Sequence, residues 1–133
     1  MGYHHEIPVR YGEVDMQQVI FNAHYLAYLD DAMDHWMRSL DANFETFGWD
    51  LMVKRAELEW DGPAGLGDVL EIESAVARWG TTSFDITHRV HVGERPVLHA
   101  LLVYVGIEPG TNRPVAPPAV IRRHLGEPGD PDA

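Results

Sequence analysis

The sequence predicts an α+β domain in which one long helix packs against an antiparallel sheet of five strands. Three observations support this fold class. The chain has 133 residues, the length of a single domain. One segment has apolar residues at helical spacing, four segments alternate between apolar and polar residues, and a fifth is almost continuously apolar. The helix follows the first strand and the other strands come in succession, so the expected order is β-α-β-β-β-β. We expect one domain over residues 1–126 and a disordered acidic tail over 127–133.

The first strand and the helix are separated by a polar loop. The strand is predicted over residues 3–11, and Pro8 within it indicates an edge strand or an irregular position because proline cannot donate a ladder hydrogen bond. The loop covers residues 12–18. The helix is predicted over residues 23–40, where apolar side chains recur three and four positions apart, and Asn22 is the expected N-cap.

The four later strands are indicated by a two-residue period that begins near residue 51. Each predicted strand is bounded by a turn signal rich in glycine or proline, and the segments are 51–60, 70–76, 84–92 and 97–107. The last segment is apolar on both faces, which is typical of a central strand or an interface. A short terminal helix is expected over residues 117–125.

One helix covers only part of one sheet face. The apolar surface left over is most simply covered by a second copy of the chain, so we expect a homodimer or a homotetramer.

Composition excludes several classes of protein. The chain has no cysteine, which excludes disulfide scaffolds, zinc fingers and cysteine nucleophiles. Its net charge of −11 argues against nucleic acid or an anionic membrane as the main partner. No apolar run approaches the length of a membrane span, and the N-terminus does not resemble a signal peptide, so a soluble cytoplasmic protein is expected.

The eight histidines do not have the spacing of a metal site, so neither a metal nor a bound cofactor is expected. His99 lies on an apolar strand, and we expect it to be a hydrogen-bonded core residue.

The loop before the helix is the best candidate for chemistry. It carries Asp15 and then runs through Val19, Ile20 and Phe21 into the helix N-terminus. The first turn of a helix has free backbone N–H groups and a positive partial charge, which can polarise a carbonyl group. A carboxylate beside such donors is a minimal arrangement for cleaving an acyl bond. The opposing interpretation is an aspartate that only caps N–H groups of its own turn.

Three stretches resemble a known family. They are residues 10–26 (RYGEVDMQQVIFNAHYL), residues 54–70 (KRAELEW followed by Pro63 and GDVL), and residues 79–84 (WGTTSF) together with the strand at 100–105. The chain resembles the hotdog-fold acyl-CoA thioesterases of the 4-hydroxybenzoyl-CoA thioesterase and YbgC-like type over residues 3–125. The resemblance implies a sheet wrapped around a central helix, hydrolysis of an acyl-CoA thioester, and an acyl pocket at a dimer interface.

The resemblance also implies roles for particular residues. Asp15 matches the general base or nucleophile, and Asn22 matches the position whose backbone N–H polarises the thioester carbonyl. Tyr11 matches a tyrosine of the same pocket, and Gln18 stands where the family usually has glycine, so its amide is a candidate contact to the thioester or a water. The expected substrate-binding residues are Tyr25, Trp60, Thr81, Thr82, Ser83, Lys54 and Arg55.

Two features of the sequence leave more than one function open. Coenzyme A is polyanionic, so an acidic protein needs local cations to hold it, and the candidates are Lys54, Arg55, Arg78, Arg89, Arg122 and Arg123. The segment 80–82 lacks the basic residues that one branch of the family has there, which favours a non-catalytic protein that binds acyl thioesters. A hotdog dehydratase or hydratase, for which His24 is the nearest candidate, and a purely structural dimer are also compatible with the sequence.

Overall fold

The computed structural model describes residues 2–131. The strands and helices follow the predicted order, including the short helix expected near the end. They are β1 (Tyr3–Pro8), α1 (His24–Arg38), β2 (Asp50–Trp60), β3 (Val69–Trp79), β4 (Ser83–Val92), β5 (Arg95–Ile107) and α2 (Ala119–Leu125). Two single-turn 3₁₀ helices, Tyr11–Glu13 and Phe44–Phe47, flank α1.

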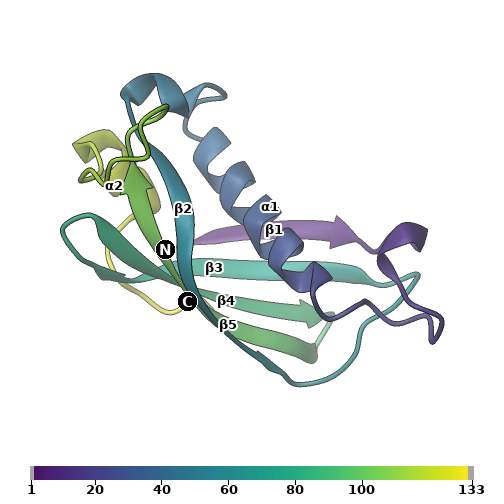
Figure 1. Cartoon of the computed structure of the whole chain (residues 1–133). Helices are drawn as coiled ribbons and strands as arrows, with labels where there is room; N and C mark the ends of the chain where they lie inside the picture. The colour runs from purple at the N-terminus through teal and green to yellow at the C-terminus, as the bar shows by residue number, and fades with distance from the viewer. Residues whose placement is uncertain (1, 132–133) are drawn as a thin grey trace.

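The five strands form one antiparallel sheet in the order β1-β3-β4-β5-β2, and α1 lies across one face of it (Figure 1). This is the hotdog arrangement that the resemblance implied. Strand β1 lies at one edge and pairs with β3, which is one of the two positions that Pro8 indicated, and β2 forms the opposite edge. Strand β5 lies between β4 and β2, so its apolar character on both faces reflects its central position.

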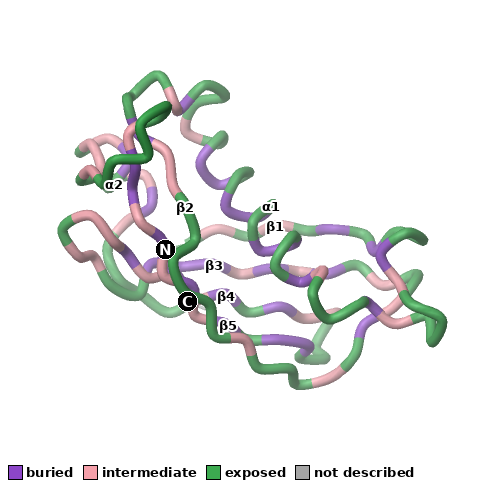
Figure 2. The backbone as a smooth tube through the Cα atoms, viewed as in Figure 1, coloured by how far each residue is buried: buried purple, intermediate pink, exposed green. Residues whose placement is uncertain are grey.

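The core lies between α1 and the sheet. Seven residues of α1 recur at helical spacing and are buried, whereas the intervening positions are exposed (Figure 2). They pack against the side chains of alternate strand residues such as Ile72, Ile86 and Leu102, each almost completely buried. Burial of this stripe is the main force that places the helix, and with it the loop before the helix.

The prediction that His99 is a core residue is wrong. The neighbouring residues of β5, Leu98 and Ala100, face α1, so His99 points to the opposite face, where it is half exposed and contacts Asp61 and Glu59. The buried histidine is instead His88.

His88 lies on the helix-facing side of β4, where its Nδ1 is 2.7 Å from the Ser74 hydroxyl and its Nε2 is 3.3 Å from the Tyr104 hydroxyl. Burial lowers the pKa of His88 to about 3, so the ring is neutral in the folded protein.

The prediction that Asn22 is the helix N-cap is also wrong. Helix α1 begins at His24 with Ala23 as its N-cap, and no side chain in the described part of the chain caps it. A turn precedes the helix, in which the His24 N–H donates to the Phe21 carbonyl and the Tyr25 N–H donates to the Asn22 carbonyl. Asn22 therefore lies one position before the N-cap, with its side chain exposed.

The C-terminal segment lies against the sheet. Helix α2 falls within the predicted 117–125, and in the following segment the Gly129 N–H donates to the Val76 carbonyl of β3. Of the predicted disordered tail 127–133, the last two residues lie outside the described part of the chain. No helix within residues 2–131 is long and apolar enough to cross a bilayer.

Candidate active site

The loop between β1 and α1 is held in place by hydrogen bonds to itself and to a second loop. Val14 and Ile20 form an antiparallel bridge, so the chain turns back on itself around Asp15. Val19 bridges to Gly65, and the Ile20 N–H donates to the Ala64 carbonyl at 2.8 Å. These contacts fix the position of Asp15 relative to the start of α1, although the two loops are separated by more than forty residues in sequence.

The backbone at Gln18 has the conformation that glycine adopts most easily. Its φ is +62°, in the left-handed region that non-glycine residues rarely occupy. The Gln18 N–H donates to the Asp15 carbonyl and closes a tight turn. The structure therefore keeps this turn in a glycine-like conformation although glutamine occupies the position, with a conformational cost of about 1 kcal/mol.

Asp15 stands exposed at the tip of this turn. Its Oδ1 accepts a hydrogen bond of 2.8 Å from the Gln17 backbone N–H, which is the turn-capping role that the sequence also allowed. Within residues 2–131 its second carboxylate oxygen, Oδ2, has no hydrogen-bonded partner. One oxygen thus orients the side chain, and the other is available to a water molecule or a substrate.

Backbone N–H groups lie next to the turn that carries Asp15. The Phe21 N–H donates to the Glu13 carbonyl, so the segment leading into α1 lies alongside the segment leading to Asp15. Among the described residues, the N–H groups of Asn22 and Ala23 donate to no protein acceptor. These two donors and the positive end of the α1 dipole are available to a carbonyl oxygen that gains negative charge.

Glu13 holds the loop through buried hydrogen bonds, and it was not among the site residues expected from the sequence. Its side chain is only 7% exposed, and it accepts hydrogen bonds from the Arg10 backbone N–H, the Arg10 guanidinium and, at 2.9 Å, the Tyr28 hydroxyl. His24 Nε2 lies 3.4 Å from its other oxygen. The spacing of Arg10 and Glu13 is that of a capping box, which was the available sequence signal.

The environment of Glu13 keeps it ionised. Burial alone would raise the pKa of Glu13, but the hydrogen bonds from Arg10 and Tyr28 outweigh it and lower the pKa to about 2. Burial and the Glu13 carboxylate together raise the pKa of the Tyr28 hydroxyl. A carboxylate with so low a pKa is a poor base, so Glu13 positions the loop rather than exchanging protons.

Exposed aromatic side chains lie on the Asp15 loop and beside the first turn of α1. Tyr11 and Phe21, which belong to the same loop, are largely exposed. Tyr25 and Trp60 are in edge-to-face contact with ring centroids 5.9 Å apart, and Trp60 is partly exposed while Tyr25 is buried. The structure therefore brings Tyr11, Phe21 and Trp60 to the region of the candidate site, with Tyr25 behind them.

The remaining predicted substrate-binding residues lie elsewhere in the same protomer. Because Pro8 at the end of β1 pairs with Val69 at the start of β3, the loop with Asp15 lies at one end of the sheet. Thr81 and Thr82 belong to the turn between β3 and β4, at the other end of these strands, and Ser83 begins β4 there. One protomer does not bring this turn to Asp15.

Lys54 and Arg55 lie midway along the edge strand β2. Both are exposed, and Arg55 is paired with Glu57. Two further candidate cations also have partners, since Arg78 is paired with Asp85 and Arg122 lies over the Trp79 ring.

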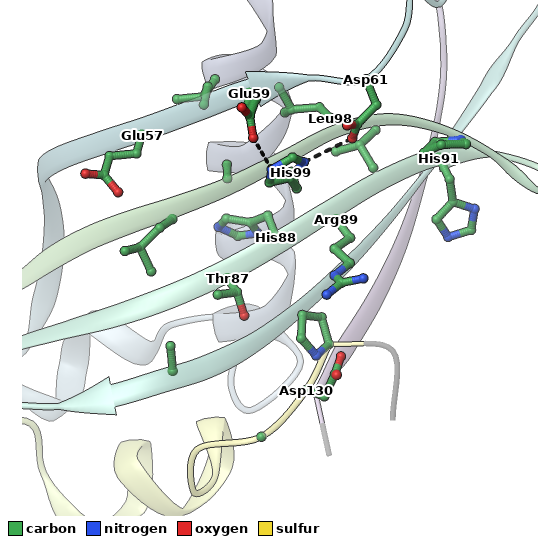
Figure 3. Close-up of a pocket in the computed structure, with 18 of the residues that line it drawn as sticks. Glu57, Glu59, Asp61, Thr87, His88, Arg89, His91, Leu98, His99 and Asp130 are labelled. Carbon is green, nitrogen blue, oxygen red and sulfur yellow. Dashed lines mark hydrogen bonds and ion pairs between the residues drawn. The ribbon is translucent and has the colours of Figure 1, made fainter.

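A groove of about 1140 Å³ lies on the sheet face turned away from α1 (Figure 3). His99 lies in it, bonded to Glu59 and Asp61. The groove does not include Asp15, and its charged lining is mostly acidic: Glu57, Glu59, Asp61, Glu94 and Asp130, beside Arg89, His91 and His99. Such a lining repels the phosphates of coenzyme A, which leaves the Asp15 loop as the candidate active site.

Comparison with known proteins indicates the family to which the chain is similar. The sequence model of a family described as the thioesterase-like superfamily matches residues 9–125. A 1,4-dihydroxy-2-naphthoyl-CoA hydrolase of Synechococcus elongatus is 25% identical over 116 residues, which cover 84% of this chain and 85% of the relative. The acyl-CoA thioester hydrolase YbgC of Escherichia coli O157:H7 is 29% identical over 124 residues, covering 86% and 90%.

A solved structure shows the same fold. The crystal structure of a 1,4-dihydroxy-2-naphthoyl-CoA thioesterase from Synechocystis superposes with a TM-score of 0.81 at 18% identity, covering 94% of this chain and 96% of that one.

Proposed function

Because this chain belongs to the thioesterase-like superfamily, we propose that it is an acyl-CoA thioesterase whose reaction takes place at the Asp15 loop. One observation carries the assignment to this loop. Among residues 2–131, one carboxylate oxygen of Asp15 has no hydrogen-bonded partner, and the N–H groups of Asn22 and Ala23, just before α1, are also available. The names of the relatives, which are hydrolases of CoA thioesters, support the reaction type.

The proposed mechanism assigns a separate task to each group. The Asn22 and Ala23 N–H groups bind the thioester carbonyl oxygen and stabilise its negative charge as the tetrahedral intermediate forms. Asp15 removes a proton from a water molecule that attacks the carbonyl carbon, or attacks it directly to form an anhydride that water then hydrolyses. The C–S bond breaks, the departing sulfur takes up the proton that Asp15 removed from water, and the products are a carboxylic acid and the CoA thiol. In the anhydride route the departing sulfur takes its proton from water.

The complete site is proposed to need a second copy of the chain. Strand β2 is a free edge with Met52, Val53 and Lys54 exposed, and pairing of two such edges gives one continuous sheet. An antiparallel partner also supplies residues from the opposite end of its own sheet, where Thr81 and Thr82 lie. Light scattering is expected to give a dimer or a tetramer at micromolar concentration, and a monomer would contradict this assembly.

The decisive experiment replaces Asp15 by asparagine. Asp15→Asn keeps the shape of the side chain and its bond to the Gln17 N–H but removes the charge, so kcat on the best acyl-CoA substrate is expected to fall about 10²- to 10⁴-fold with little change in KM. Asp41 provides a matched control, because its Oδ1 also caps the N–H two residues later, that of Asn43, at 2.8 Å. Asp41→Asn is expected to leave turnover unchanged.

The competing functions give different results in the same assay. If Asp15 only caps its turn, Asp15→Asn turns over within about threefold of the wild type and the catalytic assignment fails. A binding protein would hold acyl-CoA without releasing thiol, and a hydratase would consume an enoyl thioester without releasing thiol.

We further propose that hydrolysis itself needs no metal ion, because the groups named above supply both the base and the carbonyl-polarising donors. Turnover is expected to persist in excess chelator, and a large loss that metal restores would contradict this mechanism.

A further inference from the structure

We propose that His5, Asp31 and His35 form a binding site for a divalent transition-metal ion, of which Zn²⁺ fits the ligand set best. The three residues come from two elements. His5 lies on β1 and points toward α1, and Asp31 and His35 lie one helical turn apart on α1. The site is separate from Asp15 and does not depend on the proposed hydrolase activity.

The ligand atoms already converge on one point. His5 Nε2 lies 2.9 Å from Asp31 Oδ2, and His35 Nε2 lies 3.7 Å from the same oxygen. The three ligand atoms are all within 4.8 Å of one another, and the two imidazole rings are stacked with centroids 4.2 Å apart. In a tetrahedral zinc site with bonds of about 2.0–2.1 Å, ligand atoms are about 3.3 Å apart. Small side-chain rotations are therefore enough to close the site.

The chemistry of the donors indicates which ion binds. Two imidazoles and one carboxylate suit Zn²⁺ and related transition ions, whereas Mg²⁺ and Ca²⁺ prefer sites made of oxygen atoms. Three protein ligands leave a fourth position for water. His5 is half-buried and the other two residues are exposed, so the ion has an open path from solvent.

A second cluster on the sheet is a weaker candidate. His4, Glu6 and Glu71 also offer three ligand atoms within 4.8 Å, but only one of them is a nitrogen. His99 is a different case, because its two ring nitrogens face two different carboxylates, those of Glu59 and Asp61, and one ion cannot use both nitrogens. These two sets provide the comparison variants for the test.

The position of the site suggests a structural effect. Strand β1 leads into the Asp15 loop and α1 follows it, so an ion shared by His5 and the helix residues ties together the two elements that flank this loop. An ion that binds only the folded protein stabilises it by mass action. At a zinc concentration about 100 times the dissociation constant, the melting temperature of a domain of this size is expected to rise by about 10 °C.

The test uses the full chain, stripped with chelator and titrated with ZnCl₂ in a calorimeter. We expect one tightly bound equivalent and the rise in melting temperature. His5→Gln and His35→Gln are each expected to weaken zinc affinity at least about 10-fold, the lower limit for the loss of even a supporting contact at a metal site. His4→Gln and His99→Gln are expected to bind zinc as the wild type does. Co²⁺ in place of Zn²⁺ is expected to show the visible absorption of a tetrahedral site, and this spectrum disappears in His35→Gln.

Three results would overturn the proposal. They are the absence of a saturable equivalent, affinity that is unchanged in both His5→Gln and His35→Gln, and affinity that is lost in His4→Gln instead. Circular dichroism is the control that checks that each variant is folded, so that a loss of zinc binding reports on the site alone.

Discussion

Replacement of Glu13 by glutamine tests whether this buried carboxylate holds the candidate catalytic loop. The pKa of Glu13 is lowered from 4.5 to about 2 by the hydrogen bonds from Arg10 and Tyr28, which outweigh the opposing effect of burial. A shift of about 2.5 units corresponds to about 3 kcal/mol of folding free energy at neutral pH. Glu13→Gln keeps the size of the side chain but loses the charge and places an amide N–H₂ against the guanidinium of Arg10.

The expected loss in the free energy of unfolding at pH 7 is about 2–3 kcal/mol, or about 7–10 °C in melting temperature for a domain of this length. We also expect a fall in kcat/KM, because the loop that carries Asp15 is less well fixed. Urea unfolding followed by fluorescence measures the stability, and a thiol-release assay measures the activity. Glu94→Gln, in the exposed turn between β4 and β5, is the control and is expected to change stability by less than about 0.5 kcal/mol.

The pH dependence gives a second, independent check on Glu13. A carboxyl group whose pKa is lower in the folded state stabilises the protein above the unfolded-state value, and this stabilisation is lost as the pH falls toward the folded-state value. The difference between wild type and Glu13→Gln is therefore expected to shrink to about half by pH 3, near 1.4 kcal/mol. A difference below about 0.5 kcal/mol at pH 7, or one that is the same at pH 3, would refute the reasoning.

Three further predictions concern single positions. Gln18→Gly is expected to raise the melting temperature by about 3 °C, because glycine adopts the positive φ at this position without strain. A lower melting temperature in a thermal unfolding experiment would contradict this prediction. Burial lowers the pKa of His88 from 6.5 to about 3, so the wild type is expected to lose about 1.4 kcal/mol of stability per pH unit as the pH falls through this range. The stability of His88→Gln, measured from unfolding curves at several pH values, should not show this dependence on pH. Equal slopes in the two proteins would contradict the prediction. A Cβ at Gly65 would lie 2.4 Å from the Gln18 carbonyl oxygen, so Gly65→Ala is expected to lower the free energy of unfolding by about 1–3 kcal/mol and to reduce turnover. Gly12→Ala is the control. No atom of the described residues lies within 4 Å of a Cβ at Gly12, so this variant should behave as the wild type in both assays.

The fold was predictable from sequence because its signals are local. The apolar stripe of α1 and the two-residue period of the strands arise from the geometry of helices and strands, and each can be seen within about ten residues. Pro8 indicated an edge or irregular position for β1 for an equally local reason, the missing N–H, and the structure shows that β1 is an edge strand. The position of His99 was wrong because a two-residue period shows that two faces exist, and a strand that is apolar on both faces does not show which of them meets the helix.

The candidate site was predictable only in part. The resemblance pointed to Asp15, and the structure adds how it is held, through Gly65 and Ala64 from a distant loop. Glu13 was missed because its importance depends on Tyr28 and His24, which are far from it in sequence. The N-cap at Asn22 was wrong because the turn before α1 shifts the helix start by one residue, which propensity does not determine.

The sequence by itself determined the order and type of the strands and helices and the loop in which Asp15 lies, since these depend on neighbouring residues. The tertiary structure decided which side chains meet: Glu13 with Tyr28, His88 with Ser74, and His5 with Asp31 and His35. Such contacts are set by strand register and by how the helix packs on the sheet. Both result from the burial of the whole core at once, so no short segment of sequence encodes them.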